Sequence, residues 1–214
     1  MENKTYEPGQ AYEYQLTLDK LLKAALVYNP NQEIVYRDII RYTYKDLMRR
    51  IHKLANVLKG MGVKQGDTVA IFDYDSHRYL ECFFAVPMMG AVLQTMNFRL
   101  SPEQIVYTLN HTGATTILVH GDMLPLINSI RDKLHDVCHS IVLVDDVKPL
   151  ADDISITGEY EAMIRAADDR YNFPELDENA KATTFYTTGT TGLPKGVYFS
   201  HRQLVLHTFG LMAM

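Results

Sequence analysis

Short apolar runs alternate with amphipathic stretches along most of this chain. Apolar residues recur at helical spacing over 18–26 and 47–58, and the second stretch follows Thr43, a good helix N-cap. The β-branched run 68–72 is typical of a buried strand. Further strands are predicted around 91–95, 115–119 and 141–144, with helices over 78–89, from 102 onward and over 123–134. This alternation predicts an α/β fold with a layered, mostly parallel sheet and flanking helices.

Two later segments depart from that alternation. Between 148 and 181 the chain becomes more polar around a short predicted helix, 159–167, and we expect a surface excursion. The last segment reads as strand, loop, strand and helix, because 197–199 is β-prone and Ser200 with Gln203 forms a capping box. His201, next to that cap, is expected to face solvent rather than to belong to a site.

Composition and charge narrow the classes of protein. Among 214 residues, 21 Lys and Arg stand against 26 Asp and Glu, so the net charge of -5 argues against sequence-independent binding of nucleic acid. The two cysteines, Cys82 and Cys138, have no CxxC spacing, which excludes a disulfide scaffold. The longest apolar run, 82–93, is interrupted by Pro87 and Gly90, so we expect no transmembrane segment and a cytoplasmic location.

The segment 183–202 carries the candidate chemistry, because it is dense in glycine and threonine and contains one lysine before the following strand. Glycines allow close approach of the backbone, and hydroxyls and amides can donate to phosphate oxygens beside a lysine ammonium. We therefore predict a cradle for a polyphosphate. Its cofactor-binding residues are predicted to be Thr187, Thr188, Gly189, Thr190, Thr191, Gly192 and Lys195.

The cradle is not the P-loop of NTPases. That loop requires a Gly-Lys pair followed by Ser or Thr, whereas Lys195 follows Pro194 and precedes Gly196. A GxSxG elbow is also absent from the sequence, which weakens a serine-hydrolase alternative.

The run 186–197, YTTGTTGLPKGV, resembles the phosphate-binding signature of the adenylate-forming superfamily, which includes acyl-CoA synthetases, adenylation domains and luciferases. The segments 42–47, 62–71 and 84–92 are similar to the N-terminal domain of that superfamily, in the same order. The run 96–105 and the residues after the signature look most like medium- and long-chain fatty-acid-CoA ligases.

The resemblance implies that ATP, Mg²⁺ and CoA take part in activating a carboxylic acid, most simply a fatty acid. The acid would first become an acyl adenylate with release of pyrophosphate, and CoA would then displace AMP. The predicted loop would hold the ATP phosphates, with Thr187 near Mg²⁺. We name no catalytic residue within this chain. Two alternatives stay open: another adenylate-forming branch that activates aryl or amino acids, and a non-catalytic, truncated nucleotide-binding paralogue.

The resemblance also divides the chain. We expect 1–214 to be a partial N-terminal AMP-binding domain whose C-terminal domain is absent. Its parts would be an arm with the first helix (1–40), an α/β subdomain (41–147), the surface excursion (148–181) and the phosphate-loop hairpin with its helix (182–214). The apolar last helix has no cap, as in a polypeptide cut inside a domain. We expect such a fragment to be inactive alone and to expose apolar surface that favours a homodimer.

Overall fold

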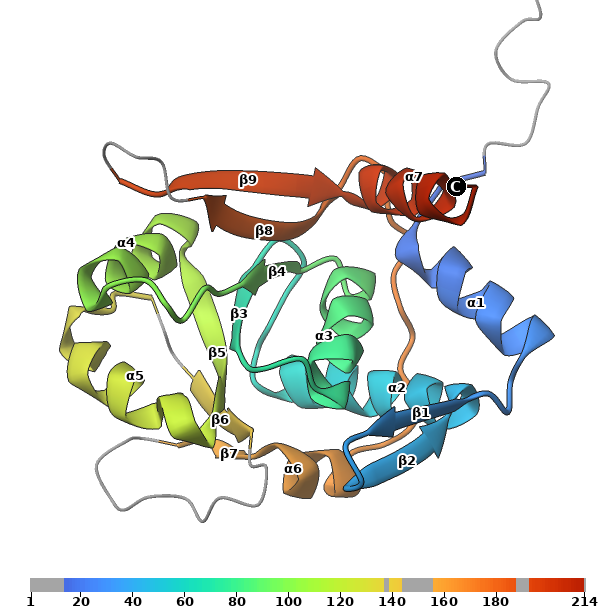
Figure 1. Ribbon diagram of the computed structural model, residues 1–214, viewed down its shortest axis with the longest axis horizontal. Helices are drawn as coiled ribbons and strands as arrows, with labels where there is room; N and C mark the ends of the chain where they lie inside the picture. Colours follow the sequence, from blue (N-terminus) through green and yellow to red (C-terminus); the bar gives the residue numbers. More distant parts are fainter. Residues whose placement is uncertain (1–13, 137–138, 144–155, 188–192, 214) are drawn as a thin grey trace, which may run out of the picture.

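The computed structural model describes residues 14–136, 139–143, 156–187 and 193–213 (Figure 1). A seven-stranded sheet runs through its centre in the order β7-β6-β5-β3-β4-β8-β9. All neighbouring strands are parallel except β8 and β9, which form an antiparallel hairpin. The strands are β3 (Thr68–Phe72), β4 (Val92–Thr95), β5 (Ala114–His120), β6 (His139–Leu143), β7 (Gly158–Glu159), β8 (Lys181–Thr187) and β9 (Lys195–Ser200). The predicted fold class is confirmed.

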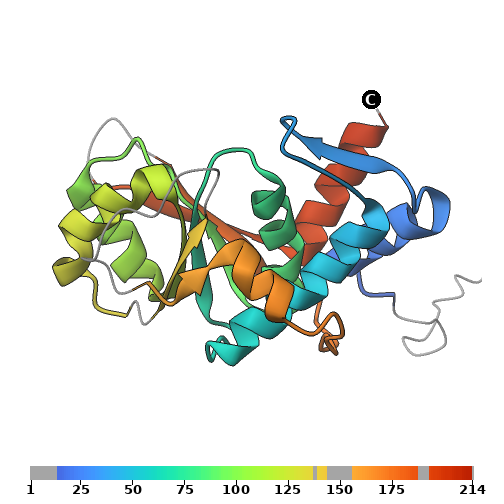
Figure 2. The same cartoon turned by 90° about the horizontal axis from the view of Figure 1, so that it is seen from below.

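Helices cover both faces of the sheet. On one face lie α2 (Tyr44–Gly60), α3 (His77–Met88) and α6 (Tyr160–Ala166), and α6 lies against α2 (Figure 2). On the other face lie α4 (Pro102–Thr112) and α5 (Leu124–Ile130). The first and last helices, α1 (Leu18–Tyr28) and α7 (His201–Met212), contact each other near β8.

Period-two patterning within the central strand explains why both faces need helices. Val69 and Ile71 of β3 belong to the core beneath α2 and α3, whereas Ala70 and Phe72 belong to the core beneath α4 and α5. All four side chains are fully buried. A strand with apolar side chains on both faces therefore requires cover on both sides, as parallel sheets do.

The predicted helix starts are confirmed by their caps. Ser101 and Gln104 form a capping box at the start of α4, and Ser200 with Gln203 forms another at α7. Thr43 caps α2 and shares its box with Asp46. Each cap satisfies amides that the first helical turn leaves without partners.

Three local expectations differ from the structure. The residues before α2 form an antiparallel hairpin, β1 (Glu33–Tyr36) with β2 (Ile40–Thr43), where no strand was predicted. The helix expected over 123–134 is shorter, because 3₁₀ turns flank α5 at Gly121–Met123 and Arg131–Lys133. Part of the expected surface excursion is integrated into the fold: β7 pairs with β6, and Tyr160 of α6 is buried.

A buried cluster of charges joins α2, α3 and α6. Arg50 Nε donates to Glu81 Oε1 at 2.7 Å, and its guanidinium also donates to both oxygens of Glu161. Tyr42 and Tyr160 donate to the two oxygens of Glu81, at 3.1 and 2.6 Å. Every oxygen of the fully buried Glu81 carboxylate therefore has a donor, as a buried charge requires.

Within the parts of the chain that the structure describes, no helix combines the length and the apolar character that a bilayer crossing demands.

Candidate functional site

The β8–β9 hairpin carries the ends of the predicted cradle. Its strands are rich in threonine and aromatic residues, which favour extended backbone. Phe185 stacks on Phe199 with ring centroids 5.7 Å apart, and Thr184 Oγ1 donates to the carbonyl of Val197 at 3.0 Å. The register places Thr187 opposite Lys195. The hairpin therefore brings the first and last residues of the predicted cradle together.

The structure describes only Thr187 and Lys195 of the residues predicted to form the cradle. Thr187 is exposed, and its hydroxyl lies 3.5 Å from the carbonyl oxygen of Lys195, to which it donates. Thr188, Gly189, Thr190, Thr191 and Gly192 lie outside the described residues. Their roles in holding a cofactor stay predictions that rest on the sequence.

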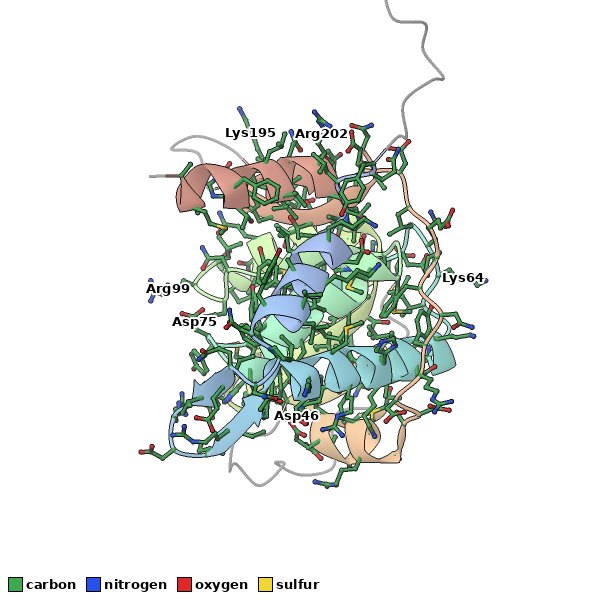
Figure 3. The ribbon with its side chains drawn as sticks, turned by 90° about the vertical axis from the view of Figure 1, so that its right-hand side faces the viewer. Asp46, Lys64, Asp75, Arg99, Lys195 and Arg202 are labelled. Atoms are coloured by element: carbon green, nitrogen blue, oxygen red, sulfur yellow. The ribbon has the colours of Figure 1, made fainter. Side chains whose placement is uncertain are left out.

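Lys195 is an exposed cation that forms no ion pair with any residue the structure describes. Among the described residues no carboxylate lies within ion-pair distance of its ammonium, and the sequence 188–192 contains no acidic residue. Figure 3 shows the side chain directed away from the body of the protein. Arg202 differs, since its guanidinium is 2.6 Å from the carboxylate of Glu178. As far as the described residues go, the ammonium of Lys195 can therefore pair with an anion from outside the chain.

The hairpin extends beyond the edge at which the parallel strands have their carboxyl ends, because β8 runs parallel to β4. At that edge, a hollow of about 700 Å³ borders the ends of β3 and β4 and includes Asp73, Asn97 and Arg99. The chain passes from β3 to β4 on one side and then to β5 on the other, so the hollow lies at a switch point in strand order. Open α/β sheets bind ligands at such points.

Asp73 is the buried acid of this hollow. Its carboxylate accepts hydrogen bonds from the amide of Tyr74, at 2.8 Å, and from the hydroxyl of Ser76. Burial raises the pKa of Asp73 above its usual value, against these hydrogen bonds. The sequence analysis did not select this residue, although an acid directly after a buried strand is a signal that could have found it.

His201 is not where the sequence placed it. The prediction of a solvent-facing residue is wrong, because the imidazole is fully buried between α7 and α1. Its Nδ1 accepts a hydrogen bond from the amide of Leu18 at 3.3 Å, and burial lowers its pKa. His201 therefore ties the first helix to the last rather than facing the cradle.

Comparison with known proteins defines the class. Residues 22–213 match the family of AMP-binding enzymes, so the chain belongs to that family. It is 38% identical over 205 residues to a long-chain-fatty-acid–CoA ligase of Thermus thermophilus, covering 94% of this chain and 36% of the relative. It is 34% identical over 204 residues to a medium-chain-fatty-acid–CoA ligase of Ectopseudomonas oleovorans, covering 94% of this chain and 37% of that protein.

A solved structure agrees with these relatives. The crystal structure of an anthranilate CoA ligase, in complex with anthranoyl-AMP, matches 88% of this chain and 35% of its own length with a TM-score of 0.78 and 27% identity. The chain thus spans little more than a third of the length of each of these three proteins. The resemblance to the adenylate-forming superfamily is confirmed.

Proposed function

We propose that this chain supplies the ATP-phosphate site of an enzyme that converts a fatty acid to its CoA thioester. The observation that carries the proposal is Lys195, which has no acidic partner among the described residues and lies at the mouth of the β8–β9 hairpin opposite Thr187. Both similar bacterial proteins are named as fatty-acid–CoA ligases. The structural relative holds an acyl adenylate, which is the intermediate of this chemistry.

The first step of the reaction needs positive charge beside the leaving pyrophosphate, and the hairpin carries the ammonium of Lys195. A carboxylate oxygen attacks the α-phosphorus of ATP, the bond to the bridging oxygen breaks, and pyrophosphate leaves with the electron pair. A CoA thiolate then attacks the acyl carbon and expels AMP. In the first step, negative charge grows on the leaving pyrophosphate, and donors preset around it lower the barrier. We assign this role to the ammonium of Lys195. The hydroxyl of Thr187 directs its proton to the carbonyl of Lys195 and keeps its oxygen lone pairs for a metal ion.

Mg²⁺ would accompany the nucleotide. The described residues contain no group of three or more His, Cys, Asp or Glu side chains that could hold a metal ion. Mg²⁺ in nucleotide sites keeps waters and phosphate oxygens as most of its ligands, so it needs few ligands from the protein. Thr187 offers a hydroxyl oxygen beside Lys195. The ion would neutralise charge on the phosphates.

The test is ATP–pyrophosphate exchange by the polypeptide as its gene encodes it, with fatty, aromatic and amino acids supplied in turn. Exchange that depends on a fatty acid is expected. Lys195→Ala should slow this exchange more than it slows thioester formation from a supplied acyl adenylate. Exchange with aromatic or amino acids alone would move the protein to another branch of the superfamily. Binding of ATP without exchange for any acid would indicate the non-catalytic alternative.

The exposed apolar side chains of α7 support a proposed homodimer. Leu206, Phe209, Leu211 and Met212 are all exposed on this helix. Apolar surface gathered on one element favours association. We expect light scattering to give twice the mass of one chain, and a monodisperse monomer would contradict this.

The buried free thiol of Cys82 also suits the proposed cytoplasmic location.

A further inference from the structure

A hydrogen bond links helix α4 to the strand that leads into the cradle. The hydroxyl of Tyr186 in β8 lies 2.6 Å from Nδ1 of His111 in α4, across 75 positions of sequence. Tyr186 directly precedes Thr187 in β8. It lies opposite Gly196, which directly follows Lys195 in β9. The bond therefore acts one position away from both described ends of the cradle.

Ring packing fixes the same contact. Tyr107 and His111, one helical turn apart on α4, stack with ring centroids 5.4 Å apart and planes at 23°. The ring of Tyr186 meets both of them edge-on, with centroids at 6.4 and 5.9 Å. Two aromatic contacts and one hydrogen bond thus hold a single tyrosine ring against α4.

Gly196 makes room for that ring. A Cβ atom at position 196 would lie 3.2 Å from Cζ of Tyr186 and 3.4 Å from its hydroxyl oxygen, closer than ordinary van der Waals contacts. The tyrosine side chain therefore lies across the backbone of the opposite strand. Its position constrains β9 as well as β8.

The surroundings of the Tyr186 phenol determine which of the two residues donates the hydrogen bond. Burial, together with the neighbouring Tyr107 and Tyr198, raises the pKa of Tyr186 to about 12, so the hydroxyl keeps its proton at neutral pH. The phenol therefore donates, and Nδ1 of His111 accepts. This arrangement leaves the imidazole proton on Nε2.

We propose that Tyr186 and His111 are positioning residues that hold the β8–β9 hairpin in the geometry that receives the nucleotide phosphates. The inference rests on the proposed function of the hairpin. Anchoring the pair 186/196 to α4 fixes the adjacent pair 187/195, so Lys195 and Thr187 are placed before the nucleotide arrives. Without the anchor, part of the binding free energy would be lost in ordering the hairpin.

Three variants test the role. Tyr186→Phe keeps the ring and removes the donor, His111→Leu removes the acceptor, and His111→Asn restores an acceptor near the position of Nδ1. Tyr107→Phe is the matched control, because among the described residues its hydroxyl makes no hydrogen bond while its ring packs in the same cluster. Affinity for Mg·ATP and for inorganic pyrophosphate is measured by calorimetry on the polypeptide as its gene encodes it.

Loss of one hydrogen bond should weaken both ligands about fivefold in Tyr186→Phe and in His111→Leu. The double variant should be no weaker than either single variant, because both remove the same bond. His111→Asn should recover most of the affinity, and Tyr107→Phe should bind like the wild type. Unchanged affinity in Tyr186→Phe and His111→Leu would overturn the inference, even if both variants unfold more easily.

A spectroscopic measurement separates this inference from the proposed function. In ¹⁵N-labelled protein, the His111 ring should be in the Nε2–H form, and that signature should weaken in Tyr186→Phe. Wild-type protein that binds neither ATP nor pyrophosphate would overturn the proposed function and the positioning role with it. Wild-type binding that the variants leave unchanged would overturn the positioning role alone.

Discussion

Two charged regions of this protein show opposite arrangements. In the cluster between α2, α3 and α6, Arg50 and Glu81 are withdrawn from water and each is bound by several partners. At the β8–β9 hairpin, Lys195 is exposed and has no acidic partner among the described residues. In the first region the charges are bound to one another, whereas in the second the ammonium of Lys195 has no partner among the described residues.

The difference separates charges that hold the fold from charges that can do chemistry. Removing one partner of a buried ion pair leaves the other charge buried without compensation, which is strongly destabilising. Such a variant should therefore lose stability rather than ligand affinity. An exposed, unpaired lysine contributes little to stability, so its removal should alter binding alone. Variants at the two regions should therefore give opposite profiles of stability and affinity.

The largest effect is expected at Glu81. Glu81→Gln replaces a carboxylate that accepts from Arg50, Tyr42 and Tyr160 with a neutral amide that brings its own donor. The free energy of unfolding should fall by about 3 kcal/mol. Urea unfolding followed by circular dichroism measures the loss. Glu33→Gln is the control, because its bridge to Arg41 is exposed, and it should change stability by no more than about 0.5 kcal/mol.

The next effect is a pH dependence from Glu161. Burial would raise the pKa of this acid, but hydrogen bonds from His77 and Arg50 outweigh it and lower the pKa to about 2. Since the pKa of the folded state is depressed, the stabilisation is complete above the ordinary pKa of 4.5 and is lost as pH falls toward 2.

Wild-type protein should therefore lose about 1–2 kcal/mol more than Glu161→Gln between about pH 6 and about pH 3, after allowing for the partial exposure of the side chain. Unfolding curves at a series of pH values give the slope of unfolding free energy against pH for each protein. Equal slopes for wild type and variant would show that the pair with Arg50 does not stabilise the fold.

A smaller effect is expected at Gly196. The added Cβ of Gly196→Ala would press on the ring of Tyr186 at 3.2 Å and should cost about 1 kcal/mol. Gly60→Ala is the matched control, since nothing lies within 4 Å of a Cβ at that helical position, and it should be neutral or slightly stabilising. Thermal unfolding of both variants compares them. A stable Gly196→Ala protein would contradict the close packing of Tyr186 on β9.

Much of the fold could be predicted because local signals and packing agree. The mostly apolar, β-prone strand at 68–72 and the capped helices at 44–60, 102–112 and 201–212 each carry their own signal in the sequence. The β1–β2 hairpin was missed because its four-residue strands are short and weakly alternating. The burial of His201 was missed because its partner, the amide of Leu18, lies 183 positions away.

The sequence carries a signal for the chemistry proposed at the candidate site, but none for the contacts that support it. The glycine and threonine pattern around Lys195 indicates phosphate binding by composition and spacing. Nothing local indicates that Tyr186 would meet His111, because that contact requires β8 to lie beside α4 in the folded sheet. Glu81 does carry a signal, since an acid at a core position of an apolar helix requires a buried partner.

The most direct test of the central claim is the affinity of Lys195→Ala for Mg·ATP, compared with wild type and with Lys181→Ala. Lys181 lies at the opposite end of β8, where its ammonium sits 4.0 Å from the ring centroid of Tyr198. Lys195→Ala should bind about tenfold more weakly or worse, with its unfolding free energy unchanged, while Lys181→Ala should bind like the wild type. Equal affinity for all three proteins would contradict the assignment of this hairpin to the phosphates of ATP.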